Sequence, residues 1–140
     1  MSDTTDIRRG SCLCGAVRFQ TSGQPVMAGN CYCLNCQKSS GAGHVFHVMF
    51  PEAAVSITGE TRGFPYSSDS GSVVTTITCA TCGSPLFGRT ARMPGMMTVR
   101  VAALDSDEGL KPAMEVYVKR RRAWDGEAGQ IPRFGGMPPM

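Results

Sequence analysis

Apolar and polar residues alternate along five short stretches of the chain, a period of two that predicts β-strands with one buried face. These stretches cover residues 16–21, 45–50, 73–78, 97–102 and 114–118. Turn-forming residues separate them, among them Ser22-Gly23, Thr58-Gly59 and Ser70-Gly71. The pattern therefore predicts a mostly β fold of short, mostly antiparallel strands.

One helix of a turn or two is expected over residues 34–38. This segment lacks glycine, proline and β-branched residues, and Ser39-Ser40-Gly41 then provides a stop. The chain has no internal repeat, and its one biased segment is the Gly-, Pro- and Met-rich stretch 131–140. One domain with a loose tail is therefore the simplest layout for 140 residues.

The composition indicates that the apolar core is small. Leu, Ile, Val and Phe together number 26, and Gly and Pro supply another 26 of the 140 residues. Such a composition often belongs to disordered chains, but the formal net charge is only +3 and seven cysteines are present. A structural zinc ion contributes on the order of 10 kcal/mol of folding free energy in small peptides, so a metal is the first candidate source of order.

The seven cysteines fall into three clusters, and none stands alone. The clusters are Cys12 with Cys14, Cys31 with Cys33 and Cys36, and Cys79 with Cys82. A glycine follows each of the two pairs and lets the chain turn past a metal with backbone N–H groups aimed at sulfur. We therefore expect the two pairs to share one zinc site of four thiolates. A redox role for the C-x2-C pair is the alternative, but no βαβ pattern surrounds it.

The remaining trio, Cys31, Cys33 and Cys36, supplies three ligands within six residues, one fewer than a tetrahedral zinc ion takes. Sites with three protein ligands are typical of catalytic zinc, because the fourth ligand is water or substrate. The alternative is that His44 or His47 completes a second structural site. These histidines lie three residues apart in a predicted strand and would point to opposite faces, so neither is named as a ligand.

Charge and hydropathy exclude several classes of partner. Eleven Arg against three Lys give a pI of about 8.5, which falls short of the balance typical of nucleic-acid-binding domains. The basic run at residues 119–122 is interpreted as a solvated loop, with a patch for acidic small molecules as the alternative. No apolar run reaches the ~18 residues that span a bilayer, so neither nucleic acid nor a membrane is expected as a partner. A cytoplasmic location is expected, where thiols stay reduced.

The three cysteine motifs, in this order and with these glycines, resemble those of the glutathione-dependent formaldehyde-activating enzymes, the Gfa family, which is grouped with centromere protein V. The motifs are GSCLCGAVRF, CYCLNCQKSSG and TCATCGSPLF. Weaker matches follow at TGE after a strand, at Leu104-Asp105, at Pro112, and at Tyr117-Val118 leading to Trp124. The resemblance extends from Gly10 to about Pro138 and so covers most of the chain.

This resemblance implies an Mss4-like fold of several small coiled antiparallel sheets organised around two zinc ions per chain. By matching motifs, the structural ion would be held by Cys12, Cys14, Cys79 and Cys82. The ion credited with chemistry would be held by Cys31, Cys33 and Cys36. The implied layout is a flexible N-terminus at 1–9, a single Gfa-like zinc-binding domain at 10–130 and a tail at 131–140.

The activity attributed to the family is the addition of glutathione to formaldehyde, formally a carbon–sulfur lyase reaction run in the synthetic direction. We therefore expect a zinc-dependent lyase that adds a zinc-bound thiol, such as glutathione, to formaldehyde or a related small aldehyde. The alternative is a non-catalytic zinc module that binds thiols or a protein partner, because a fold does not fix a function. The presence of only two histidines in the chain favours that alternative, since it leaves little material for acid–base chemistry.

Two further residues near the trio are candidates for a role. Lys38 is the closest positive charge in the sequence and is predicted to steady the added thiolate or a glutathione carboxylate, with an exposed lysine at a helix end as the alternative. Tyr32 stands where the family usually has histidine. It is interpreted as a packing residue, with a hydrogen bond to substrate as the alternative.

Overall fold

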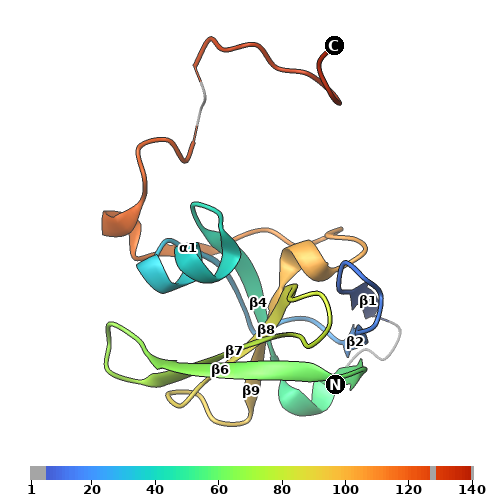
Figure 1. Ribbon diagram of the computed structural model, residues 1–140. Coiled ribbons are helices and arrows are strands. Elements are labelled where there is room, and N and C mark those ends of the chain that lie inside the picture. Colours follow the sequence, from blue (N-terminus) through green and yellow to red (C-terminus); the bar gives the residue numbers. More distant parts are fainter. Residues whose placement is uncertain (1–5, 127–128, 140) are drawn as a thin grey trace.

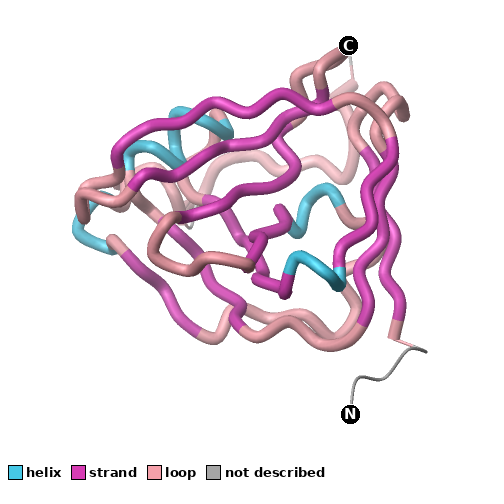
Figure 2. Tube along the Cα trace, turned by 90° about the horizontal axis from the view of Figure 1, so that it is seen from below, coloured by secondary structure: helices cyan, strands magenta, loops and turns pink. Residues whose placement is uncertain are grey.

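A computed structural model of the chain describes residues 6–126 and 129–139, in which strands dominate and helices are short (Figures 1 and 2). A three-stranded sheet has the order β1-β2-β5, with bounds Ile7–Ser11, Arg18–Ser22 and Val55–Thr58. A seven-stranded sheet has the order β10-β3-β4-β9-β8-β7-β6, with bounds Met114–Val116, Met27–Cys31, Val45–Pro51, Met96–Arg100, Pro85–Thr90, Val73–Cys79 and Thr61–Ser67. The predicted mostly β fold with antiparallel sheets is confirmed, and among the described strands β10 alone pairs in parallel, with β3.

The helical segments of the described residues are all short. The helix α1 spans Leu34–Ser40 and follows β3 directly. The Cys33 side chain accepts a hydrogen bond from the Cys36 N–H at the start of α1, and Gly41 ends it at a φ of 74°. Three 3-10 turns, η1 at Glu52–Ala54, η2 at Val101–Ala103 and η3 at Val118–Arg120, complete the set for the described residues. The predicted helix is thus present and two residues longer than expected.

The hydrophobic core lies between the two sheets. Val48, Val99 and Phe87 come from neighbouring strands of the large sheet, where Val99 is the register partner of both others, and all three are buried. Phe19 of the small sheet meets Phe87 edge to face, with ring centroids 4.9 Å apart. Because side chains alternate across a strand, the residues between these buried positions point to the opposite face of the large sheet.

The C-terminal part of the chain after β10 is fastened to α1 by the buried side chain of Gln37. Its Nε2 donates to the backbone oxygens of Tyr32 at 2.8 Å and Arg120 at 2.9 Å. Its Oε1 accepts from Arg122 Nε at 2.7 Å. The basic run at 119–122 is exposed, yet its backbone and one of its side chains hold this segment against the helix.

The five predicted strands match only some of the strands in the structure. Residues 45–50 and 73–78 fall within β4 and β7, whereas 97–102 and 114–118 each end in a 3-10 turn. The pattern missed β1 and β5 and the glycine-containing strands β3 and β8. It also missed β6, which contains Pro65 and lies at the sheet edge where a missing N–H is tolerated.

The N-terminal boundary also differs from the expectation of a flexible segment at 1–9. Strand β1 begins at Ile7, and residues 7–11 pair with β2 through the whole strand. The ordered structure therefore starts earlier than residue 10, because the backbone of β1 supplies hydrogen-bond partners to β2. Residues 1–5 of the predicted segment lie outside the described residues. A search of the described residues for a helix long and apolar enough to cross a membrane finds none.

Candidate metal centres

Four cysteine sulfurs meet where two turns come together. Cys12 and Cys14 follow β1, and Cys79 and Cys82 lie at the end of β7 and in the turn after it. All four sulfurs lie within 4.8 Å of one another, with Cys12 Sγ 3.6 Å from Cys14 Sγ and Cys14 Sγ 3.8 Å from Cys79 Sγ. Sulfurs placed about 2.3 Å from one ion in a tetrahedron lie about 3.8 Å apart, so this spacing fits a single zinc ion.

Local backbone geometry holds these sulfurs in place. Gly15 and Gly83 adopt φ values of 81° and 78°, as the sequence predicted for the residue after each pair. The N–H of Val17 donates to Cys12 Sγ at 3.2 Å, and the N–H of Cys82 donates to Cys79 Sγ at 3.4 Å. The Ser84 hydroxyl, 3.1 Å from Cys82 Sγ, lowers the pKa of that thiol to about 5. These donors favour the thiolate form that a metal requires.

The second cluster gathers the sulfurs of Cys31, Cys33 and Cys36, which lie within 4.8 Å of one another. Cys31 ends β3, Cys33 caps α1, and Cys36 lies in its first turn, so the strand-to-helix junction brings the three together. The Cys36 N–H donates to Cys33 Sγ at 3.3 Å. Hydrogen bonds from the Cys31 and Cys36 thiols lower the pKa of Cys33, and the same contacts raise the pKa of Cys36.

Neither histidine joins the trio. Among the described residues, no fourth Cys, His, Asp or Glu ligand atom lies within the same 4.8 Å grouping. His44 Nδ1 instead lies 2.7 Å from Asp125 Oδ2, and its ring stacks on Tyr32 at a centroid distance of 4.8 Å. His47 lines the cavity beside the trio. The two histidines therefore have separate surroundings.

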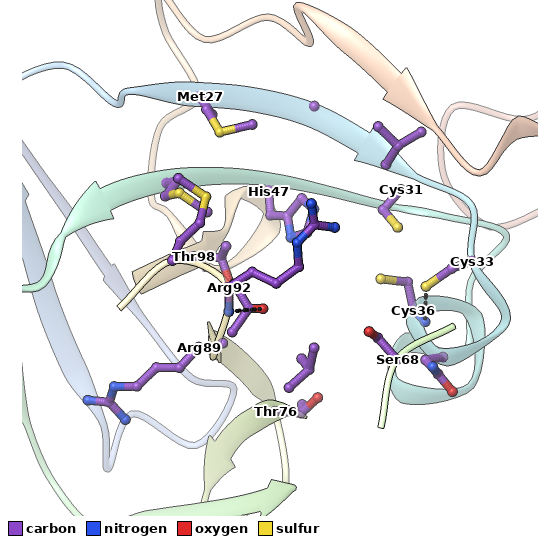
Figure 3. Close-up of a pocket in the computed structure, with 18 of the residues that line it drawn as sticks. Met27, Cys31, Cys33, Cys36, His47, Ser68, Thr76, Arg89, Arg92 and Thr98 are labelled. Carbon is purple, nitrogen blue, oxygen red and sulfur yellow. Dashed lines mark hydrogen bonds between the residues drawn. The ribbon is translucent and has the colours of Figure 1, made fainter. Parts of the chain in front are cut away.

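A cavity of about 470 Å3 opens beside the trio, on the face of the large sheet that looks away from the core. All seven strands of this sheet contribute to the lining, and β7, β9 and β10 do so through alternate residues. Representatives are Cys31 of β3, Met49 of β4, Thr98 of β9, Gly88 of β8, Thr76 of β7 and Tyr66 of β6. In Figure 3 the three cysteines lie at one end of this cavity, and Met27 and Arg89 lie toward the other.

The basic groups of the cavity are arginines. Arg100 lines it near the trio and donates from Nη2 to Ser39 Oγ of α1 at 2.9 Å, while burial lowers the pKa of its guanidinium. Arg89, which is paired with Glu52, and Arg92 line the same cavity. Lys38, the basic residue that the sequence favoured, is exposed and is not part of the lining. Its position on the outer side of α1 follows from helix periodicity, because it lies two residues from Cys36 and so points away from it.

Tyr32 is buried and makes its own contacts, as the packing interpretation of this residue expected. Its hydroxyl donates to Glu115 Oε2 at 2.7 Å, and this hydrogen bond raises the pKa of Tyr32 and lowers that of Glu115. Tyr32 is not among the residues that line the cavity.

The sequence did not identify Arg100 and His47 as cavity residues. The alternation of apolar and polar residues over β4 and β9 was the available signal, but alternation does not show which strands are neighbours in the sheet.

The fold and the two cysteine clusters define a small β protein that can hold two metal ions through sulfur. Residues 7–120 match the family described as glutathione-dependent formaldehyde-activating enzyme, and the chain belongs to this family. It is 30% identical over 111 residues to a Halomonas elongata protein named "Putative glutathione-dependent formaldehyde-activating enzyme", a match that covers 70% of this chain and 66% of that protein. The chain thus spans just under two thirds of the length of this relative.

A solved structure supports the fold. The crystal structure of a Rhodobacter sphaeroides protein superposes with a TM-score of 0.53 and 24% sequence identity, covering 74% of this chain and 91% of that one.

Proposed function

We propose that this protein is a zinc-dependent carbon–sulfur lyase that adds a thiol, glutathione in the first place, to formaldehyde or a related small aldehyde. The observation that carries the proposal is the trio of Cys31, Cys33 and Cys36 next to a cavity, with no fourth ligand atom from the described chain grouped with them. Membership of the formaldehyde-activating family supports the choice of substrates.

Zinc fits both clusters by the chemistry of their donors. Four sulfurs at tetrahedral spacing match a closed structural site, and three sulfurs beside a cavity match a site that takes its fourth ligand from substrate. When bound at the trio, zinc would lower the pKa of a coordinated thiol and keep its sulfur as a thiolate near neutral pH.

The residues around the trio would support an anionic sulfur. Three thiolates already outweigh the two charges of a zinc ion, so a fourth would leave the site with a net charge of about −2. Arg100 supplies a positive charge from the cavity wall, and it is fixed by Ser39 on the same helix that carries Cys36. We assign to Arg100 the compensating charge that the sequence placed on Lys38.

The proposal is tested first by thiol binding to cobalt-substituted protein. The absorption spectrum should change when glutathione is added and should not change with S-methylglutathione, which has no free thiol. Adduct formation from glutathione and formaldehyde is then followed by 13C exchange NMR, with the spontaneous rate subtracted. Thiol binding without acceleration of the reaction would favour the non-catalytic zinc module over the lyase.

A further inference from the structure

We propose that Arg100 and His47 form the site for the aldehyde oxygen: the Arg100 guanidinium stabilises the negative charge that collects on this oxygen as thiol sulfur adds to the carbon, and His47 carries the thiol proton to it. This proposal rests on the proposed function and assigns to two residues the binding and the protonation of the aldehyde oxygen.

The two side chains are brought together by the register of the large sheet. His47 of β4 is the direct partner of Arg100 of β9, and side chains directly opposite each other share one face. Both residues line the cavity that is also lined by Cys31, Cys33 and Cys36. An aldehyde approaching a sulfur at the trio would therefore meet these two groups from the sheet.

Arg100 has the properties of an oxyanion donor. Its Nη2 is held by Ser39 Oγ at 2.9 Å, which fixes the guanidinium relative to α1 and the trio. Among the described residues Arg100 makes no ion pair with a carboxylate. A partly buried cation without a carboxylate partner costs free energy, and this cost is offset when an anionic group binds beside it. Charge that develops during the reaction is the kind of anion such a fixed donor favours.

His47 has the properties of a proton carrier. Its side chain makes no hydrogen bond to any residue in the described part of the chain, and the residue lines the cavity. Burial, followed by the nearby charge of Arg100, lowers the pKa of His47 and keeps the ring neutral at pH 7. A neutral imidazole accepts a proton at one nitrogen and can release it again.

The reaction balances without a further reactant. The S–H bond of the thiol breaks and its proton passes to the His47 ring, while the electron pair stays on sulfur. Sulfur then forms a bond to the aldehyde carbon, and the π electrons of the carbonyl move to oxygen beside Arg100. The protonated His47 ring returns the proton to this oxygen, which gives a hydroxymethyl thioether when the aldehyde is formaldehyde.

Matched variants of the metal-loaded protein test this assignment. His47→Asn and Arg100→Gln should each reduce kcat for the glutathione–formaldehyde reaction by about 10- to 100-fold, because each removes a transition-state interaction. Glutathione affinity, measured by calorimetry, should stay within about twofold of the wild-type value in His47→Asn, whereas Arg100→Gln should also bind glutathione more weakly, because Arg100 compensates the charge of the bound thiolate. Arg100→Lys keeps the charge and should recover part of the loss. Lys38→Ala and Arg62→Gln, which alter exposed cations outside the cavity, should react as the wild type does.

A second measurement separates chemistry from packing. In His47→Ala, added imidazoles should restore turnover to a degree that follows their pKa, whereas a filler of space would restore it regardless of pKa. The assignment is overturned if His47→Asn or Arg100→Gln turns over like the wild type with correct metal content. It is also overturned if the loss in His47→Asn appears only as weaker glutathione binding, or if kcat is unchanged in Arg100→Gln. If the wild type itself does not exceed the spontaneous rate, the proposed function fails and this assignment fails with it.

Discussion

His44 Nδ1 lies 2.7 Å from Asp125 Oδ2, a contact that joins the loop after α1 to the segment that follows β10. Gly43 packs against the Asp125 carboxyl, since a Cβ built on this glycine would lie 2.4 Å from it. With the Gln37 and Tyr32 hydrogen bonds, this contact fastens residues 114–125 beside the cavity, which Tyr117 of the same segment lines.

Breaking this contact should loosen the C-terminal segment without unfolding the sheets. We expect Asp125→Asn to lower the free energy of unfolding by about 1 kcal/mol, since it replaces a partly buried charge-assisted hydrogen bond with a neutral one. Urea denaturation measures this loss, and amide hydrogen exchange should rise at residues 114–125. Asp107→Asn, an exposed acid, is the control. An unchanged exchange pattern in Asp125→Asn would contradict the fastening role.

Gly59 should tolerate substitution far less than another glycine of similar backbone conformation. Its φ is 101°, and a Cβ there would lie 2.2 Å from the backbone oxygen of Ala16. Gly71 has a φ of 86°, and a Cβ there would meet nothing within 4 Å. Both Gly→Ala changes introduce strain at positive φ, so the difference between them isolates the steric clash. We expect Gly59→Ala to be less stable than Gly71→Ala by about 1–3 kcal/mol in urea denaturation.

Removal of a cysteine should have different consequences at the two clusters. Cys79→Ser should lose the structural ion and the fold, because Cys79 is part of the buried core and accepts three backbone N–H contacts from the turn that follows it. Cys31→Ser should lose one ion and keep the fold. Metal content by mass spectrometry and secondary structure by circular dichroism check both outcomes. Unfolding of Cys31→Ser would show that both ions are structural.

The Tyr32–Glu115 hydrogen bond should make stability depend on pH in a defined direction. The Tyr32 hydroxyl lowers the folded-state pKa of Glu115 from its ordinary value of 4.5. Its contribution is therefore fully present above the unfolded pKa and is lost as the pH falls through the lowered folded value. Tyr32→Phe should reduce stability at pH 7, and the difference from the wild type should shrink below about pH 4.5. Urea denaturation across this range measures the difference. In a Glu115→Gln background, the effect of Tyr32→Phe on stability should no longer depend on pH in this range.

The sequence indicated the cysteine grouping better than it indicated the strands. Within each of the pairs Cys12/Cys14 and Cys79/Cys82, a tight turn with glycine places the two sulfurs side by side whatever surrounds it, and the two pairs meet as the sequence predicted. Strand β3, with sequence MAGNC, carries no alternation, and its place in the sheet comes from pairing with β4 and β10. Such pairing joins residues far apart in the chain, which a local pattern does not contain.

The positions of Lys38 and Arg100 show that a local pattern also fails to predict which cation lines the cavity. Lys38 is two residues from Cys36 in sequence, yet helix periodicity turns it outward. Arg100 is 64 residues from Cys36, and the pairing of β9 with β4 carries it to the cavity wall. Distance along the chain therefore did not indicate which cation lines the cavity.

The sequence alone determined the mostly β class, the four-plus-three division of the cysteines and the helix after Cys33, because short-range spacing and backbone preference decide each of these. Only the tertiary structure decided that His44 binds Asp125, that His47 and Arg100 share a cavity with the trio, and that Lys38 does not. These outcomes depend on strand register and on which sheet face is buried, and both are set by long-range packing of the whole chain.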